Sequence, residues 1–362
     1  MSDSVLIICT SLNMGGSEKQ AVWLANKLVD ENKKVYFVSL KDAGILSTEL
    51  NPKISVNNFK LRNAKNPLTK FLYLCLGVIK LARLTKSKKI TTTITFLFHS
   101  NVVGKLLKII SRGKILHIAT FRSDRLSKRD SKISRFRTLI FKNFVLDKDI
   151  FVVFNSMSGL NNMNLKNVNT RVVFNTPLNN VQLSKDTNEH TTKLVFIGRF
   201  DELKNVENIV LSMKYLLDED IVLDIYGKGP DLASLEQAII KNSLQNKVKL
   251  KGIDKEIANK LSNYDALIIA STHDAFPNVL IEAMNAGVVP ISTKVGDCKW
   301  LLNENRGIFI NGFDPESISL SIKEFYEMDL NKKNEIIING RNFINQNLSE
   351  EKIFKDWLDI LF

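Results

Sequence analysis

Residues 274–284 read DAFPNVLIEAM, and this stretch determines how the rest of the chain is interpreted. The apolar run of residues 266–270 directly before it predicts a buried strand. A turn follows, and we expect a helix to start near Asn278, because asparagine is a favoured N-cap residue. Asp274 lies on the turn and Glu282 about one helical turn inside the helix, so both carboxylates can accept hydrogen bonds from sugar hydroxyls. The helix N-terminus suits a phosphate, since its first backbone N–H groups lack helical partners and the helix dipole is positive there.

Two acids with seven residues between them resemble the acid-x7-acid motif of the retaining glycosyltransferases of family 4, which have the GT-B fold. In that family the first acid, usually glutamate, contacts the donor sugar, and the second holds the nucleotide ribose. The resemblance implies these roles for Asp274, which is one methylene shorter than glutamate, and for Glu282. It also implies that the donor lies against the backbone of Phe276, Pro277, Asn278 and Val279. A capped, buried helix with incidental acids is the alternative interpretation.

A second motif follows the strand predicted for residues 194–197. Gly198, Arg199 and Lys204 stand at the strand tip before a helix, where forked guanidinium donors and an ammonium charge can clamp a diphosphate. In the resembling family such a pair binds the donor's pyrophosphate, which implies that role for Arg199 and Lys204. The alternative is a solvated charged loop. The resemblance places further donor contacts at later strand ends, namely Gly227, Gly252 and Ile253.

The first half of the chain carries a glycine loop after its first strand. Residues 5–9 predict the strand, and Gly15 and Gly16 open a helix that leads to the next strand at residues 35–38, which makes a βαβ unit. This order resembles the Gly-Gly-small-Glu loop of the family, which faces the donor across the interdomain cleft. A simple turn is the alternative interpretation of the glycine pair.

Two polar residues are expected at strand tips of this half, because each follows a β-rich run. His99 follows residues 93–98 and Arg122 follows residues 115–120. Many family members have a histidine near the reacting sugar where this chain has Arg122, so the arginine is a departure that still offers positive charge to donor or acceptor oxygens. His99 is the nearest polar substitute, and a structural histidine is its alternative role.

Charge divides the chain unequally. The net charge is +13, yet residues 1–175 hold 30 basic and 10 acidic side chains, while residues 176–362 hold 21 and 28. This asymmetry predicts that the first half meets an anionic partner. Residues 68–89 predict a basic amphipathic helix suited to an anionic membrane surface, with an ordinary Rossmann helix as the equal alternative. Basic residues with interleaved aromatics in residues 112–142 could also bind nucleic acid, but no nucleic-acid motif accompanies them.

The length of 362 residues suits two α/β domains. We expect a GT-B fold with two facing Rossmann-like domains at residues 1–175 and 193–348, a linker at 176–192, and a terminal helix at 349–362 that crosses back to the first domain. No secretory signal or membrane-spanning run is visible, and three scattered cysteines are expected to be reduced. These features favour a cytoplasmic protein, peripheral at the inner face of the membrane.

The function predicted is a retaining glycosyltransferase that moves a hexose or N-acetylhexosamine from a nucleotide-diphosphate sugar to a lipid-linked or growing surface glycan. UDP is assumed from the commonest family members. No metal or other cofactor is expected. The rivals are an anionic-polymer or nucleic-acid binding protein, which leaves the motif spacing unexplained, and a sugar-nucleotide epimerase or dehydrogenase. No Gly-x-Gly-x-x-Gly follows the first strand, which counts against dinucleotide binding.

Overall fold

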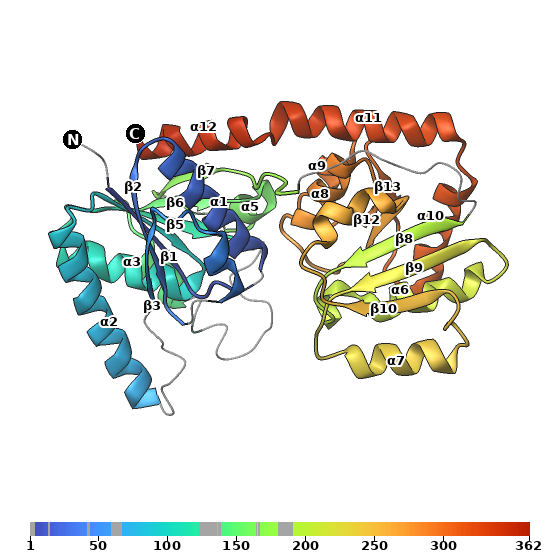
Figure 1. The fold of residues 1–362 in the computed structure, drawn as a ribbon, viewed down its shortest axis with the longest axis horizontal. Coiled ribbons are helices and arrows are strands. Elements are labelled where there is room, and N and C mark those ends of the chain that lie inside the picture. Colours follow the sequence, from blue (N-terminus) through green and yellow to red (C-terminus); the bar gives the residue numbers. More distant parts are fainter. Residues whose placement is uncertain are drawn as a thin grey trace. The chain divides into compact units, whose positions relative to one another are not determined.

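A computed structural model describes residues 4–13, 15–41, 44–58, 67–122, 136, 139–163, 165, 167–179 and 191–362, with the side chains of residues 67–74 left out. The chain forms two compact units (Figure 1). Unit 1 comprises Met1–Asn175 and Ile353–Phe362, and unit 2 comprises Thr176–Lys352. The predicted linker is only partly described, because residues 180–190 lie outside the described residues. Asn179, before that gap, donates to backbone carbonyls of Ala258 and Glu282, so it is part of unit 2.

Unit 1 is built on a parallel sheet with the strand order β3-β2-β1-β4-β5-β6-β7. Its strands are β1 (Ser4–Cys9), β2 (Lys34–Ser39), β3 (Ser55–Asn58), β4 (Thr92–Phe96), β5 (Leu116–Phe121), β6 (Phe151–Phe154) and β7 (Asn169–Val172). The main helices are α1 (Gly16–Asp30), α2 (Pro67–Ser87), α3 (Phe98–Ile110) and α5 (Met157–Met163), with short turns at Ile45–Glu49 and Phe141–Val145. Every residue of β1 is buried, as expected for a central parallel strand with helices on both faces.

Unit 2 repeats this architecture with the order β10-β9-β8-β11-β12-β13, again parallel. Its strands are β8 (Thr192–Ile197), β9 (Ile221–Tyr226), β10 (Val248–Gly252), β11 (Ala266–Ile269), β12 (Val289–Thr293) and β13 (Ile308–Ile310). The helices are α6 (Val206–Ser212), α7 (Leu232–Lys241), α8 (Asn278–Ala286), α9 (Cys298–Leu302), α10 (Pro315–Glu327) and α11 (Leu330–Asn347), with short turns at Glu202–Lys204, Met213–Leu216 and Ile257–Asn263. Apolar side chains of α6, α7 and α10 form one core with the sheet.

Both sheets reverse their strand order beside the first strand of the unit. In unit 1 the reversal falls between β1 and β4, and in unit 2 between β8 and β11. Helices on opposite faces leave a crevice beyond the carboxyl ends of such strands, which is where open α/β sheets bind ligands. The predicted pair of Rossmann-like domains is confirmed, and the sheet order alone selects the loops after β8 and β11 as a candidate site.

The last helix, α12 (Glu350–Leu361), packs on unit 1 through residues Ile353–Phe362. Trp357 is buried with its ring centroid 6.5 Å from that of Phe96, and Phe354 meets the edge of Trp23 at 6.3 Å. Ser349 Oγ accepts from the Lys352 backbone N–H at 3.3 Å, so the predicted N-cap is confirmed. Among the described residues, no helix has the length and apolar character needed to span a membrane.

Two local expectations need correction. The predicted start of α8 near Asn278 is confirmed, but the N-cap is Pro277, in an extended conformation and without a side-chain cap, and Asn278 is already the first helical residue. Strand β4 ends at Phe96, two residues earlier than predicted, because the chain bends at Leu97 (φ +73°) and α3 begins at Phe98. His99 therefore lies in the first turn of a helix rather than at the tip of a strand.

Candidate functional site

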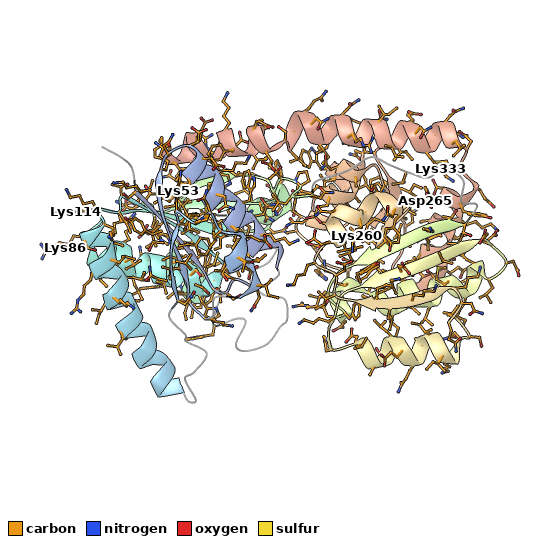
Figure 2. The ribbon with its side chains drawn as sticks, viewed as in Figure 1. Lys53, Lys86, Lys114, Lys260, Asp265 and Lys333 are labelled. Carbon is orange, nitrogen blue, oxygen red and sulfur yellow. The ribbon has the colours of Figure 1, made fainter. Side chains whose placement is uncertain are left out.

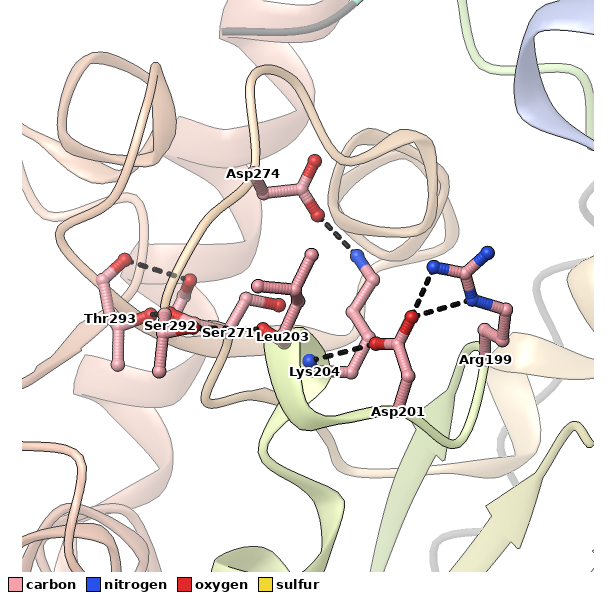
Figure 3. A network of polar contacts seen from close by, with 9 residues as sticks. Arg199, Asp201, Leu203, Lys204, Ser271, Asp274, Ser292 and Thr293 are labelled. Carbon is pink, nitrogen blue, oxygen red and sulfur yellow. Dashed lines mark hydrogen bonds and ion pairs between the residues drawn. The ribbon is translucent and has the colours of Figure 1, made fainter. Parts of the chain in front are cut away.

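The turn after β8 is held by a single carboxylate. Asp201 Oδ1 accepts from the Lys204 backbone N–H at 3.2 Å and so caps the short helical turn Glu202–Lys204. Asp201 Oδ2 accepts from Arg199 Nε at 2.6 Å and also from Arg199 Nη2 (Figure 3). Both cations predicted to clamp a diphosphate are therefore connected to Asp201, one through its backbone and the other through its guanidinium.

An ion pair joins this turn to the loop after β11. Lys204 Nζ contacts Asp274 Oδ2, and Figure 3 shows the lysine side chain extending from one loop to the other. The Thr272 backbone N–H donates to Leu203 O at 2.9 Å, which fixes the two loops a second time. Three of the predicted site residues, Arg199, Lys204 and Asp274, thus lie in one contact network. Arg199 keeps 59% of its side chain exposed, whereas Asp274 keeps 17%, so the guanidinium remains open to solvent.

Glycines let two further loops close against this network. Gly227, after β9, has φ +147°, and a Cβ there would lie 1.8 Å from Gly198 O. Gly296, after β12, has φ +52°, and a Cβ there would lie 2.0 Å from Asp274 O. Neither position accepts a larger residue without moving the backbone. The loops after β8, β9, β11 and β12 therefore form one interlocked surface at the carboxyl edge of the sheet.

Glu282 and the other predicted donor contacts belong to the same edge. Glu282 is buried in α8, and its carbonyl accepts from Asn179 Nδ2 at 2.9 Å. Phe276 is buried ahead of α8, while Asn278 and Val279 form its first turn. Gly252 ends β10 with φ +70° and no atom within 4 Å of where a Cβ would lie, and Ile253 beside it is exposed. These positions are compatible with a nucleotide, and their roles stay predictions.

The loop after β1 carries the glycines predicted in unit 1. Gly15 caps α1 and Gly16 begins it. The Glu18 carboxylate lies over Gly15, because a Cβ on Gly15 would be 2.3 Å from Glu18 Oε2. Burial raises the pKa of Glu18, and a 3.5 Å hydrogen bond from Ser11 Oγ acts weakly in the opposite direction. The loop therefore presents a carboxyl group that takes up a proton more readily than a solvated one.

Arg122 directly follows β5 in unit 1. Its Nη1 donates to Asn175 Oδ1, and its guanidinium lies 5.0 Å from the centroid of the Phe96 ring. Burial lowers the pKa of Arg122 to about 10, so it stays a cation at neutral pH. His99 is exposed, with its ring against the edge of Phe98 at a centroid distance of 5.4 Å.

Metal ligands form no candidate site in the part of the chain that the structure describes, where no three His, Cys, Asp or Glu side chains gather around one point. The expectation of a reaction without a metal remains a prediction.

Residues 181–343, which make up most of unit 2, match the family of Glycosyl transferases group 1. The chain carries a group 1 glycosyltransferase domain. All the residues of the network between the loops after β8 and β11 fall within this glycosyltransferase domain. The match supports the predicted enzyme class, a transferase, for this domain.

Curated relatives of the glycosyltransferase domain include both partial and nearly full-length matches. N-acetyl-alpha-D-glucosaminyl L-malate synthase of Bacillus anthracis is 27% identical over 130 residues, which are 36% of this chain and 34% of that protein. Two other curated glycosyltransferases are matched over 55% and 48% of their own lengths, so the chain spans about half of such relatives. N-acetylgalactosamine-N,N'-diacetylbacillosaminyl-diphospho-undecaprenol 4-alpha-N-acetylgalactosaminyltransferase of Campylobacter jejuni is 22% identical over 90% of this chain and 91% of its own.

The fold extends to solved structures. HepE of Anabaena, crystallised in complex with UDP and glucose, superposes with a TM-score of 0.82 at 16% identity, covering 99% of this chain and 98% of HepE. A glycosyltransferase of Rickettsia africae gives a TM-score of 0.80 at 17% identity. At identities this low, the superpositions establish the fold alone. That fold is the predicted GT-B fold.

Several residues of the network were missed by sequence reasoning. The sequence analysis assigns Asp201 no role, although an aspartate three residues before Lys204 is a helix-capping pattern. Thr272 and Gly296 carry no signal in a single sequence, because their roles depend on contacts between loops that are distant in the chain. The capping pattern could have identified Asp201 as the residue that fixes Lys204.

Proposed function

We propose that the protein is a retaining glycosyltransferase of family 4 that binds a UDP-sugar at the carboxyl edge of unit 2 and transfers the sugar to a lipid-linked glycan. The observation that carries this proposal is the contact of Lys204 with Asp274 beside Arg199, at the point where the sheet reverses its order. A dehydrogenase of similar architecture would need no such pair of cations beside an acid.

In this proposal, Arg199 and Lys204 bind the diphosphate of the donor. Negative charge grows on the leaving diphosphate during transfer, and fixed cations stabilise that charge most strongly in the transition state. Lys204 must first exchange the Asp274 carboxylate for a phosphate. The exchange costs little, because a partly exposed ion pair contributes only about 1 kcal/mol or less.

The same exchange frees Asp274 to accept hydrogen bonds from the donor sugar, while Glu282 holds the ribose. The site has no protein nucleophile in this scheme. The acceptor hydroxyl attacks the anomeric carbon on the face that the diphosphate leaves, the C–O bond to the diphosphate breaks, and the leaving oxygen takes the acceptor's proton. Front-face attack keeps the configuration of the sugar, and the Campylobacter relative, named for an alpha linkage, is consistent with it.

The acceptor proposed is a saccharide on a polyprenyl diphosphate, and the protein is proposed to work at the inner face of the membrane. The name of the Campylobacter relative specifies a diphospho-undecaprenol acceptor. Unit 1 offers a matching surface on α2, where Leu76 and Ile79 keep 64% and 46% of their area exposed beside Lys80, Arg83 and Lys86. Exposed apolar groups with basic neighbours suit an anionic bilayer.

A panel of UDP-, GDP- and TDP-linked sugars tests the donor assignment by release of the nucleoside diphosphate in the presence of a prenyl-diphosphate saccharide. We expect release from one UDP-sugar, with kcat lowered about 100-fold by Asp274→Asn, in the range of lost transition-state contacts. Asp265→Asn is the matched control, because Asp265 caps the Lys193 N–H at the opposite end of β11. Equal activity of the two variants, or no release from any UDP-sugar, would refute the proposal.

A further inference from the structure

Arg122 is a charged group that the transfer chemistry of unit 2 does not use. It stands at the carboxyl end of β5, beside Asn155 at the end of β6, because Phe121 pairs with Phe154 and the Asn155 N–H donates to Phe121 O at 3.3 Å. Asn175 follows β7, the next strand of the sheet. Three neighbouring strands of unit 1 therefore deliver polar side chains to the edge at which parallel sheets bind ligands.

The contacts of Arg122 are few for a guanidinium with five N–H donors. Nη1 donates to Asn175 Oδ1 and the group lies against Phe96. Nε is closed off from solvent and has no partner among the described residues. Asn155 Oδ1, at the end of the neighbouring strand, is likewise buried and lacks a hydrogen-bond donor within the described ranges. Among the described residues, two neighbouring strand ends thus carry a donor and an acceptor without partners.

Among the described residues, no carboxylate forms an ion pair with Arg122. Of the described acidic groups, Cys9 is the one whose charge acts on the guanidinium, and burial raises the pKa of the Cys9 thiol well above its usual range. The Cys9 thiol therefore stays neutral. A partly buried cation for which the described residues supply no counter-ion is costly to the fold.

Arg306 shows how the same chain fixes an arginine whose role is structural. Its Nε and Nη2 donate to the carbonyls of Leu301 and Trp300 at 2.9 and 2.8 Å, and its Nη1 pairs with Glu304 at 2.6 Å. Its guanidinium lies 4.2 Å from the Phe343 ring centroid. Each of these two arginines lies against an aromatic ring, but within the described residues only Arg306 has a carboxylate partner and an acceptor at each of its three nitrogens.

We propose that Arg122 and Asn155 form an anion site for the phosphate of the acceptor, in which the guanidinium binds a phosphate oxygen and Asn155 Oδ1 accepts a sugar hydroxyl of the same ligand. The ligand class is a prenyl-diphosphate saccharide, and the inference rests on the proposed function, which supplies such an acceptor. The donor's diphosphate is assigned separately to Arg199 and Lys204. Arg122 then lowers the stability of the ligand-free fold and contributes to ligand binding, which is a common compromise at functional sites.

The test is the thermal unfolding of the full chain in phosphate-free buffer. Arg122→Met should leave the midpoint unchanged or raise it by a few degrees, because it removes a partly buried charge that has no counter-ion among the described residues. Arg306→Met, the matched control, should lower the midpoint, because it leaves Glu304 and two carbonyls without their donor. A fall for Arg122→Met as large as that for Arg306→Met would show that Arg122 is structural and would overturn the proposal.

Ligand binding is measured in a chain that carries Arg199→Gln and Lys204→Gln, so that the donor clamp does not contribute. Geranyl diphosphate and inorganic pyrophosphate should both raise the unfolding midpoint of this chain, and Arg122→Met should abolish both shifts while Arg122→Lys keeps part of them. A shift with pyrophosphate alone would overturn the acceptor assignment, and shifts that survive Arg122→Met would overturn the site. Stabilisation of the wild-type chain by UDP tests the proposed function independently of these outcomes.

Discussion

Asp201 illustrates how one carboxylate can organise two cations. Its two oxygens bind different partners, the backbone N–H of Lys204 and the guanidinium of Arg199. Two N–H groups of Arg199 point toward Asp201, which leaves the remaining donors of its fork for a ligand. An arginine held in this way loses less side-chain entropy on binding than a freely rotating one. Asp201 is therefore expected to be a positioning residue for the donor diphosphate.

The substitution Asp201→Asn tests this role. Asparagine still caps the turn, but its amide no longer attracts the guanidinium, so the KM for the donor should rise about tenfold, equivalent to about 1.4 kcal/mol, while kcat changes less. The measurement is initial rates over a range of donor concentrations, together with unfolding midpoints.

Asp329→Asn is the matched control. Asp329 caps the Lys332 N–H at 2.9 Å at the start of α11, and its carboxylate lies 3.6 Å from Lys332 Nζ. Both variants should have similar stability, and only Asp201→Asn should change the donor KM. A lower KM in Asp201→Asn would mean that the aspartate competes with the donor for Arg199, which contradicts a positioning role.

Single residues were predictable where the motif itself carries the chemistry. The resemblance of their motifs to family 4 implies that Arg199, Lys204 and Asp274 serve one donor site, and the structure brings the three into one contact network. The intramolecular partners were not predictable, because Lys204 and Asp274 are 70 residues apart and nothing in the sequence says that they pair. The roles of these residues in binding remain predictions until a donor is present.

At the scale of elements, apolar runs located the strands well and their ends less well. The run at residues 266–270 became β11 (Ala266–Ile269), and residues 5–9 fall within β1. The observed strand ends differ from the predicted ones where local geometry sets them. At Leu97 the positive φ bends the chain, so β4 ends and α3 begins. Single-sequence patterns carry hydrophobic period but no information on such a bend, and for this reason His99 was assigned to the wrong element.

His117 in β5 is expected to make the free energy of unfolding depend on pH. The imidazole is buried, its Nε2 lies 2.9 Å from Thr95 Oγ1, and Gly104 of α3 leaves the space that it fills. Burial, with smaller effects of Lys108 and Lys105, lowers the pKa of His117 from 6.5 to about 3. Between pH 6.5 and about pH 3, His117 is therefore protonated in the unfolded chain and neutral in the folded chain. Acid favours unfolding in this window, because the unfolded chain binds one more proton.

The expected effect of His117 is a loss of up to about 1.4 kcal/mol of unfolding free energy for each pH unit below 6.5. Urea unfolding of the wild type and of His117→Gln between pH 7.5 and 5 measures it. The glutamine variant should be less stable at pH 7.5, since it packs less well, yet its stability should fall less steeply with acid. Parallel pH profiles for the two proteins would contradict the assignment of a neutral buried imidazole.

At the scale of the whole molecule, the uneven charge has a structural counterpart in unit 1. Lys86 near the end of α2 and Lys114 after α3 carry side chains that point outward (Figure 2). The two helices contact each other, and Ile109, Ile110 and Leu116 are exposed near Lys114. Sequence reasoning left membrane helix and ordinary Rossmann helix equally open for α2. The burial of Val78 and Leu81 beside the exposure of Leu76 and Ile79 is compatible with both, so the membrane role stays a prediction. The second basic run remains undecided, since residues 123–135 and 137–138 lie outside the described residues.

Sedimentation with vesicles tests the proposed membrane surface. The chain should sediment with phosphatidylglycerol vesicles and not with phosphatidylcholine vesicles, and added salt should release it, because screening weakens attraction between exposed charges. Arg83→Glu with Lys86→Glu should reduce binding several-fold. Lys241→Glu with Lys249→Glu, two charge reversals in unit 2, should not. Equal loss in both double variants would point to net charge alone rather than a surface on α2.

The central claim is that the carboxyl edge of unit 2 binds the diphosphate of a UDP-sugar through Arg199 and Lys204, and calorimetric titration of the full chain with UDP tests it most directly. The account predicts saturable binding that weakens at least tenfold in Lys204→Gln and is unchanged in Asp265→Asn. An RNA oligonucleotide titrated separately should not bind, and its presence in the UDP titration should not weaken UDP binding. Binding of the RNA without binding of UDP, or UDP binding that is indifferent to Lys204, would contradict the account.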